Sequence, residues 1–370
     1  MFLRKMGAGQ TKMTVTKKIK IEGDFIDSFI YSGSLFLVDT QLRLTSYSWN
    51  EILNYSNCPT IKKNFLLNCF SENDTQDISK LDNEYIIYND SLNNSIIDTL
   101  ELDSWPTDLD IYKNKFIISS ADGIKSVVGN RSVENLKVKF EFSQNVKNMW
   151  DEKVFELAVG TLDRLIISCG YEGAFELFTR TKADSYELVK EKQLSEKEWI
   201  GCEWDQNTGI AILKNQLKQE LLKFETVNRE HVSLITDQME KSRYYKMIKE
   251  EDPIEYEIPN SIQKYVNSWV FENKVYLLSE DLNLYEYDNN NLNKISEVNN
   301  NQRLIGKIID SAKTHFGLVF EDMENLYLQN SDISILSNNV TNWRTYPKSR
   351  NYQNHIHFIE DDSLTIQIFE

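Results

Sequence analysis

The stretch that decides the fold is Asp108–Val128, DLDIYKNKFIISSADGIKSVV. Leu109–Tyr112 predicts a short strand, which a two-residue turn follows. Phe116–Ile118 is a continuous apolar run, typical of a strand that is covered on both faces. Ala121–Gly123 predicts a second turn, because glycine takes positive φ without steric cost. Ile124–Val128 then returns antiparallel, so the stretch predicts a three-stranded β-meander.

Versions of this unit recur along the whole chain. We anchor each copy eight residues before its central apolar run, and a looser last copy has Ile356 in its run. The clear anchors are Asp27, Asp77, Asp108, Leu157, Cys202, Asn267 and Asp310. Successive frames are 31 to 65 residues apart, mostly near 40 to 50. A repeat of that length built from short β runs favours a β-propeller over a helical array.

We therefore expect one all-β propeller over residues 13–370, after a disordered tail at 1–12. Seven blades are favoured and eight remain open, because the frame at Asp77 spans only 31 residues. Met13–Glu22 alternates apolar and charged residues and predicts a strand. The last frame ends after its third strand, so we expect the N-terminal strand to complete that blade and to close the ring.

Three stretches resemble the strand-turn-strand core of WD40-type repeats: IISSADGIKSVV (117–128), IISCGYEGAFELF (166–178) and LLSEDLNLYEYD (277–288). We interpret the Gly-His and Trp-Asp signatures of that family as absent from the repeat frames. The resemblance implies a β-propeller and ring closure by an N-terminal strand. It implies no particular activity, because one fold serves many functions.

Charge and cysteine content exclude several classes of function. The net charge is −16 and the pI about 4.9, which disfavours binding to nucleic acid and to anionic membranes and favours a basic partner surface. The four cysteines include no CxxC pair, which predicts free thiols in a reducing cytoplasm. Because the chain has no 18-residue apolar stretch and no signal-like segment, we expect neither a membrane span nor secretion.

One frame carries an insertion at about residues 225–261. Val232, Ile235, Met239 and Tyr245–Ile248 form a rough helical stripe that ends before Pro253. We expect a partly helical segment on one rim of the propeller. It either decorates that rim or serves as a partner-docking arm or a lid.

His355 and His357 are two residues apart on a predicted strand, so both point to one face. With a nearby carboxylate such a pair binds zinc or iron in other proteins. The nearest acids lie in the following turn, and a third ligand is lacking. We therefore favour packing histidines and expect no metal and no cofactor.

Recurring carboxylates stand beside the innermost strand of four frames: Asp27, Asp77, Asp108 and Asp310. They either accept backbone N–H groups at their own strands or form a ring of carboxylates in the central channel, which would bind a cation or a basic peptide. We favour the structural role, because one acid per repeat is what a repeated structural task produces.

Aromatic residues gather at the start of the innermost strands. The candidates for a partner-binding rim are Trp105, Trp199, Tyr265 and Trp269. Aromatic side chains are enriched in interaction hot spots, and they are equally common in packing between blades.

Catalytic signatures are absent: the chain has no GxGxxG, GxxxxGK[ST], GxSxG or HExxH motif. We therefore expect a non-catalytic scaffold or adaptor that binds another protein through one propeller rim. The alternative is an enzyme or ligand-binding protein with a small-molecule or metal site in the channel.

Overall fold

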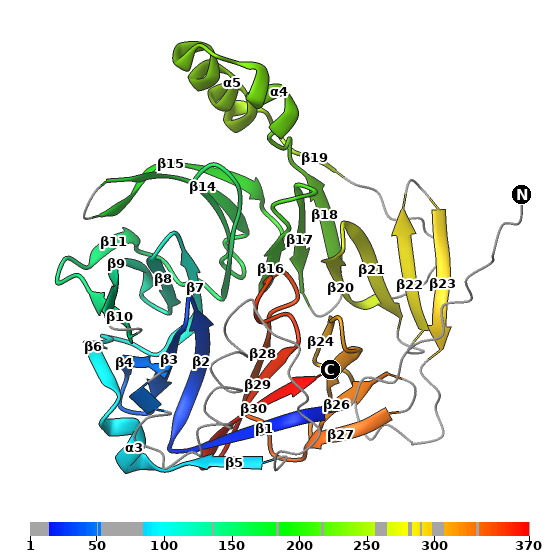
Figure 1. Ribbon diagram of the computed structural model, residues 1–370. Coiled ribbons are helices and arrows are strands. Elements are labelled where there is room, and N and C mark those ends of the chain that lie inside the picture. Colours follow the sequence, from blue (N-terminus) through cyan, green and yellow to red (C-terminus); the bar gives the residue numbers. More distant parts are fainter. Residues whose placement is uncertain are drawn as a thin grey trace, which may run out of the picture. The chain divides into compact units, whose positions relative to one another are not determined.

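The computed structural model describes residues 15–49, 51–52, 84–134, 137–182, 185–215, 218–255, 265–279, 283–288, 291–297, 307–330 and 333–369. Its strands form seven sheets, and the fold is an all-β, seven-bladed β-propeller (Figure 1). The chain divides into two compact units. The first comprises residues 1–33, 49–95 and 298–370, and the second residues 34–48 and 96–297.

The second unit holds four complete blades, each with its strands in sequence order. Blade 2 has β7 (Pro106–Tyr112), β8 (Lys115–Ser120), β9 (Gly123–Glu134) and β10 (Lys137–Phe142), and β11 (Lys147–Trp150) also pairs with β9. Blade 3 has β12 (Glu156–Val159), β13 (Arg164–Ser168), β14 (Ala174–Thr181) and β15 (Tyr186–Ser195). Blade 4 has β16 (Gly201–Trp204), β17 (Ile210–Lys214), β18 (Gln219–Lys223) and β19 (Ile254–Glu255). Blade 5 has β20 (Tyr265–Phe271), β21 (Lys274–Ser279), β22 (Asn283–Asp288) and β23 (Asn291–Glu297).

Blade 1 has the strand order β2-β3-β4-β6. Three of its strands belong to the second unit: β3 (Ser34–Asp39), β4 (Arg43–Ser48) and β6 (Ile96–Glu101). Its innermost strand, β2 (Phe25–Tyr31), belongs to the first unit.

The apolar runs that define the repeat are the second strands of the blades, and β8 and β13 are buried along their whole length. Consecutive side chains of β13 pack into different cores. Leu165 and Ile167 join a cluster with Ile117 and Ile124 of blade 2, whereas Ile166 packs among residues of blade 4. Because side chains alternate between the two faces of a strand, a strand between two blades must be apolar at every position.

The first turn in several blades is a two-residue turn with positive φ at both positions. Lys113 and Asn114 have φ of 49° and 61°, and Glu272 and Asn273 have 48° and 65°. This is the conformation of a type I′ turn, whose twist matches that of the strands it joins. The turn predicted between Tyr112 and Lys115 is confirmed.

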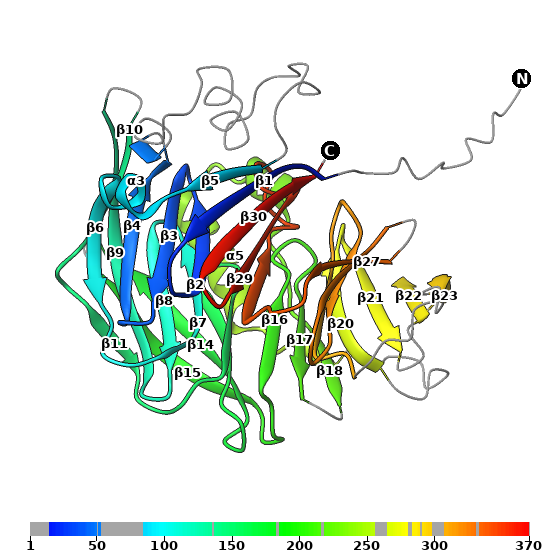
Figure 2. The same ribbon diagram turned by 90° about the horizontal axis from the view of Figure 1, so that it is seen from below.

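The first unit contains the last two blades. Blade 6 has β24 (Asp310–Lys313), β25 (Leu318–Glu321), β26 (Leu326–Gln329) and β27 (Ile333–Ser337). Blade 7 has β28 (Asn342–Thr345), β29 (His355–Glu360), β30 (Ser363–Phe369) and then β1 (Val15–Glu22). Strand β1 runs antiparallel to β30, with Ile19 opposite Ile366 (Figure 2). The predicted closure by the N-terminal strand is confirmed.

The frame anchored at Asp77 does not form an eighth blade. Its apolar run is β5 (Glu84–Ile87), a fifth strand of blade 7 that lies parallel to β1, with Tyr85 opposite Ile19. A helical turn, α3 (Asn89–Asn93), follows it. A short apolar run has the same pattern whether it is the second strand of a blade or an added edge strand, so the frame was misread. Asp77 itself lies outside the described residues.

The insertion in blade 4 is partly helical, as predicted, and contains two helices, α4 (Arg229–Leu234) and α5 (Gln238–Glu250). Side chains of Asn228 and Asp237 cap their first turns by accepting backbone N–H groups. Figure 1 shows both helices beyond the ends of β18 and β19. No helix in the described part of the chain is long and apolar enough to cross a membrane.

Candidate functional site

The blades of the second unit have two ends, and the strand register assigns residues to each. In blade 2, Pro106 pairs with Ser120, and Ser120 with Gly123, so the segment before the first strand and the second turn lie at one end. We call this end of blades 2 to 5 the Trp105 rim. The opposite end, which carries the first turn of each blade, is the Lys113 rim.

The Trp105 rim exposes two large aromatic rings. Trp105 is 55% exposed, and Tyr171, in the second turn of blade 3, is 84% exposed. Ile200, just before the first strand of blade 4, adds a smaller exposed apolar side chain. The three residues come from blades 2, 3 and 4, which follow one another in the chain.

The other predicted aromatic residues are largely covered. Trp199 and Trp269 are buried, and Tyr265 is half-buried. Of the four predicted partner-binding residues, only Trp105 therefore offers a large exposed ring. The sequence reading missed Tyr171. The available signal was a bulky aromatic residue within Gly170–Gly173, a turn that already stood out in the repeat.

Trp199 holds the Tyr171 turn in place through backbone hydrogen bonds. Its backbone exchanges two hydrogen bonds with Gly170, at N···O distances of 2.7 and 3.1 Å. Its indole Nε1 donates to Ser195 Oγ at 2.9 Å. Gly173 has φ of 101°, and a Cβ there would lie 2.0 Å from the Ser195 carbonyl oxygen. The turn that carries Tyr171 is thus fixed by backbone contacts.

Acidic side chains surround these rings. The segments that define the rim in blades 2 to 4 are 102–105, 121–122, 151–155, 169–173, 196–200 and 215–218. Their described residues include three lysines, Lys153, Lys197 and Lys218, and seven exposed acids: Asp103, Asp122, Asp151, Glu152, Glu172, Glu196 and Glu198. Lys197 is already paired with Glu220, and Asp103 is paired with Lys125 of β9. The Trp105 rim therefore carries an excess of acids over lysines.

The recurring carboxylates accept backbone N–H groups at the start of the innermost strands. Asp27, Asp108 and Asp310 each accept the N–H of the next residue at 2.7 Å. Asn267 does the same through its side-chain oxygen, at 2.8 Å. The innermost strand is a sheet edge, and an edge leaves N–H groups without a partner in the sheet. A short side chain with an acceptor oxygen at this position gives one of these N–H groups a hydrogen-bond partner.

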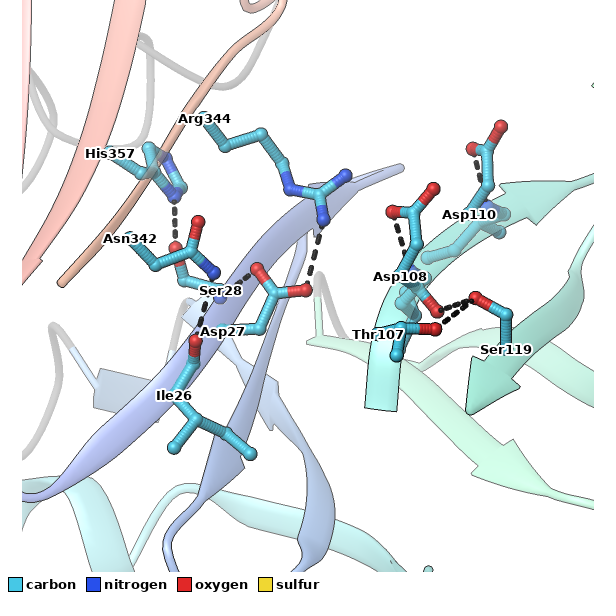
Figure 3. Close-up of polar contacts among 12 residues, drawn as sticks. Ile26, Asp27, Ser28, Thr107, Asp108, Asp110, Ser119, Asn342, Arg344 and His357 are labelled. Carbon is cyan, nitrogen blue, oxygen red and sulfur yellow. Dashed lines mark hydrogen bonds and ion pairs between the residues drawn. The ribbon is translucent and has the colours of Figure 1, made fainter. Parts of the chain in front are cut away.

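Carboxylates also tie neighbouring blades of the second unit together. Asp108 Oδ2 accepts the N–H of Leu157 at 3.0 Å, and Glu156 Oε2 accepts the N–H of Cys202 at 2.9 Å. Burial, with the charge of Asp108 nearby, raises the pKa of Glu156 to about 8. These contacts link the innermost strands of blades 2, 3 and 4. Figure 3 draws Asp108 with Thr107 and Ser119, which hydrogen bond to each other within blade 2.

A polar network joins β2 to blade 7 within the first unit. Arg344 Nη2 lies 2.9 Å from Asp27 Oδ2 (Figure 3), and the guanidinium stands over the Phe29 ring. Asn342 Nδ2 donates to the carbonyl oxygen of Ile26 at 2.9 Å. The Asp27 side chain therefore holds a backbone N–H and an arginine at the same time.

The two predicted histidines are buried in the same region. His357 Nδ1 lies 3.1 Å from Ser28 Oγ and 3.2 Å from Tyr346 Oη. Burial, with the charges of His355 and Arg344, lowers the pKa of His357. A serine beside a histidine is the arrangement of an activated nucleophile. Here both side chains are buried away from solvent, so the pair serves as a tie between β2 and β29. Within the described residues, no group of three or more His, Cys, Asp or Glu side chains is placed to hold a metal ion.

Comparison with known proteins adds no relationship by sequence. No protein-family model matches the chain, and no curated protein matches it at a significant level.

Proposed function

We propose that this β-propeller is a non-catalytic protein-interaction module that binds another protein through the Trp105 rim. The observation that carries the proposal is the exposed Tyr171 ring on a turn fixed by backbone hydrogen bonds to Trp199. Trp105 on the preceding blade adds a second exposed ring. Exposed aromatic residues on rigid supports make effective binding anchors, because little conformational freedom is lost on association.

The charge of the rim indicates the partner's chemistry. Seven exposed acids against three lysines favour a protein surface with lysine or arginine around an apolar anchor. Complementary charge of this kind accelerates association and rejects acidic competitors. The same charge disfavours nucleic acid and anionic membranes as ligands of this rim.

The resemblance to WD40-type repeats concerns the fold and by itself implies no activity. The four-stranded antiparallel blades and the β1–β30 closure agree with it. Two Trp-Asp dipeptides do occur in the chain, contrary to the expectation from the frames: Trp150 is the last residue of β11 and Trp204 the last residue of β16, and an aspartate follows each. We place the protein in the cytoplasm, a proposal that the buried free thiols of Cys169 and Cys202 support.

The test is affinity capture from the native host with wild-type protein and with Tyr171→Ala, Trp105→Ala and the double variant, quantified by mass spectrometry. We expect a stoichiometric partner whose recovery falls at least tenfold in the double variant and whose binding weakens as salt rises. Tyr88→Ala is the matched control, because Tyr88 is also exposed, at 58%, but lies outside the rim. Equal recovery with the double variant and the wild type, at unchanged melting temperature, would refute the proposal.

A further inference from the structure

A turn at one end of blade 6 displays a methionine to solvent. The turn comprises residues 322–325, between β25 and β26, and Met323 in it is 81% exposed. Ile309, just before β24, is 61% exposed. The backbone N–H of Ile309 donates to the carbonyl oxygen of Glu321, the residue before the turn, at 2.9 Å. Both exposed apolar side chains therefore belong to the same end of this blade.

A buried aspartate fixes the methionine turn. Asp322 Oδ1 accepts two backbone N–H groups of the turn, at 2.9 and 2.8 Å, and its backbone N–H donates to the Asn325 carbonyl oxygen at 3.0 Å. The Tyr327 hydroxyl donates to Asp322 Oδ2 at 3.0 Å. Tyr327 also stacks on Phe320, with 4.9 Å between the ring centroids. The carboxylate of Asp322 is thus engaged within the fold, and the turn presents Met323 on a fixed backbone.

Two hydrogen bonds join blade 7 to this end of blade 6. Ser337 of β27 pairs with Leu326, just after the turn, and donates from Oγ to Glu360 Oε1 at 2.6 Å. Trp343 of β28 donates from Nε1 to Glu321 Oε2 at 2.7 Å. The second turn of blade 7, which follows Glu360, therefore lies at the same end.

Acids outnumber lysines at this end of the two blades. Its described segments are 307–310, 321–325, 337–341 and 360–362. They hold one lysine, Lys307, and seven acids: Asp310, Glu321, Asp322, Glu324, Glu360, Asp361 and Asp362. Lys20 Nζ of β1 lies 3.9 Å from Asp362 Oδ1 and offsets one of these charges. The surface therefore carries an excess of negative charge.

The acids stand directly beside the exposed apolar side chains. Asp310 follows Ile309 in the chain, Glu324 follows Met323, and both acids are exposed. Burial raises the pKa of Glu321, and the charges of Asp310 and Asp322 raise it further. Carboxylates that repel one another in this way gain when a cation comes close.

We propose that Ile309, Asp310, Met323 and Glu324 form a docking surface for a protein segment that carries an apolar side chain flanked by lysine or arginine. An acidic segment would be repelled, and a purely apolar one would cover the carboxylates without giving them a partner. The unbranched thioether of methionine adapts to apolar groups of different shape. This Met323 surface shares no residue with the Trp105 rim, so it does not rest on the function proposed above.

The experiment selects binders from a random linear peptide library displayed on phage. The bait is the full chain with Trp105→Ala/Tyr171→Ala, so that the Trp105 rim contributes no exposed ring. We expect the enriched peptides to share an apolar residue with lysine or arginine beside it. The most enriched peptide is then synthesised with a fluorescent label, and fluorescence polarisation gives its Kd for each variant of the bait.

Adding Ile309→Ala/Met323→Ala to the bait should raise this Kd at least tenfold at an unchanged melting temperature, whereas Met323→Leu should retain most of the affinity. Glu324→Gln should weaken the dependence of the Kd on salt. Ile335→Ala is the matched control, because Ile335 is also exposed, at 51%, but lies on the outer strand β27 of the same blade.

Three outcomes would overturn the proposal. The first is a selection that enriches no peptide, and the second is a set of enriched peptides without basic residues. The third is a Kd that Ile335→Ala raises as much as Ile309→Ala/Met323→Ala does. None of them bears on partner capture by Tyr171 and Trp105, because the bait lacks both rings.

Discussion

The two rims of the second unit differ although the same strands build them. At the Lys113 rim, described first turns such as Lys113-Asn114 and Glu272-Asn273 are two residues long and have positive φ at both positions. At the Trp105 rim, the longer turn around Tyr171 needs glycine at fixed places and displays an apolar ring. Short turns match the strand twist and leave little room for variation, so the longer turns carry the exposed binding groups.

The charge distribution sharpens the contrast. Acids gather at the Trp105 rim around exposed rings, whereas the Lys113 rim holds the Lys113–Asp163 ion pair and buries Arg164 with Glu176. An insertion is tolerated at the Lys113 rim because the outer strand β19 restores the blade after the helices. The Trp105 rim thus presents exposed aromatic rings among acids, and the Lys113 rim carries charges that are paired with one another.

The largest expected effect comes from breaking the buried pair at the Lys113 rim. Arg164→Met should lower the free energy of unfolding by about 3–5 kcal/mol, because Glu176 is left buried without its partner. The double variant Arg164→Met/Glu176→Leu should recover most of the loss. Chemical denaturation of both variants provides the measurement. A double variant as unstable as the single one would mean that lost packing against Trp204 and Phe224, and not charge, accounts for the effect.

A smaller loss is expected at the Trp105 rim from Gly173→Ala. The left-handed φ alone costs about 1–3 kcal/mol for a residue with a Cβ, and the overlap with the Ser195 carbonyl adds to it. The reverse change at the opposite rim, Glu272→Gly, serves as the control. It should not lower the stability, because glycine relieves the positive φ that Glu272 already adopts. Similar melting temperatures for Gly173→Ala and the wild type would show that the Tyr171 turn is not fixed.

The last expected effect is a pH dependence that originates on the Trp105 side of blade 3. The pKa of Glu156 in the folded protein, about 8, is above its ordinary value of 4.5, so the folded state binds the extra proton. Its stabilising contribution is complete below pH 4.5 and is lost as the pH rises towards 8. Urea midpoints at pH 5 and pH 8 should therefore differ less in Glu156→Gln than in the wild type. An identical pH profile for the two proteins would assign the dependence to other groups.

The sequence predicts the strands well where periodicity is decisive and the contact surface poorly. Phe116–Ile118 and its counterparts locate the second strands, because burial on both faces requires an unbroken apolar run. The same criterion fails for Tyr85–Ile87, since an added edge strand shows the same run. Exposure is harder still. Trp105 and Trp199 occupy equivalent places in their frames, yet only the pairing of Trp199 with Gly170 decides which of them is buried.

Ion pairs between blades could not be predicted from local patterns. Lys113 and Asp163 are 50 residues apart in the chain, and only the tertiary structure brings the two side chains within 3.2 Å. The carboxylates that accept N–H groups were easier to find, because they recur once per repeat with the same task.

The pairing of β1 bears on how the chain folds during synthesis. Ile19 faces Ile366 in one neighbouring strand and Tyr85 in the other. Strand β1 is synthesised long before β30 and must therefore wait for it before blade 7 can close, and pairings over such sequence separations form slowly. The parallel partner β5 emerges much earlier. We infer that β5 can pair with β1 before the C-terminal strands are made. One edge of β1 is then already covered and cannot pair with another chain.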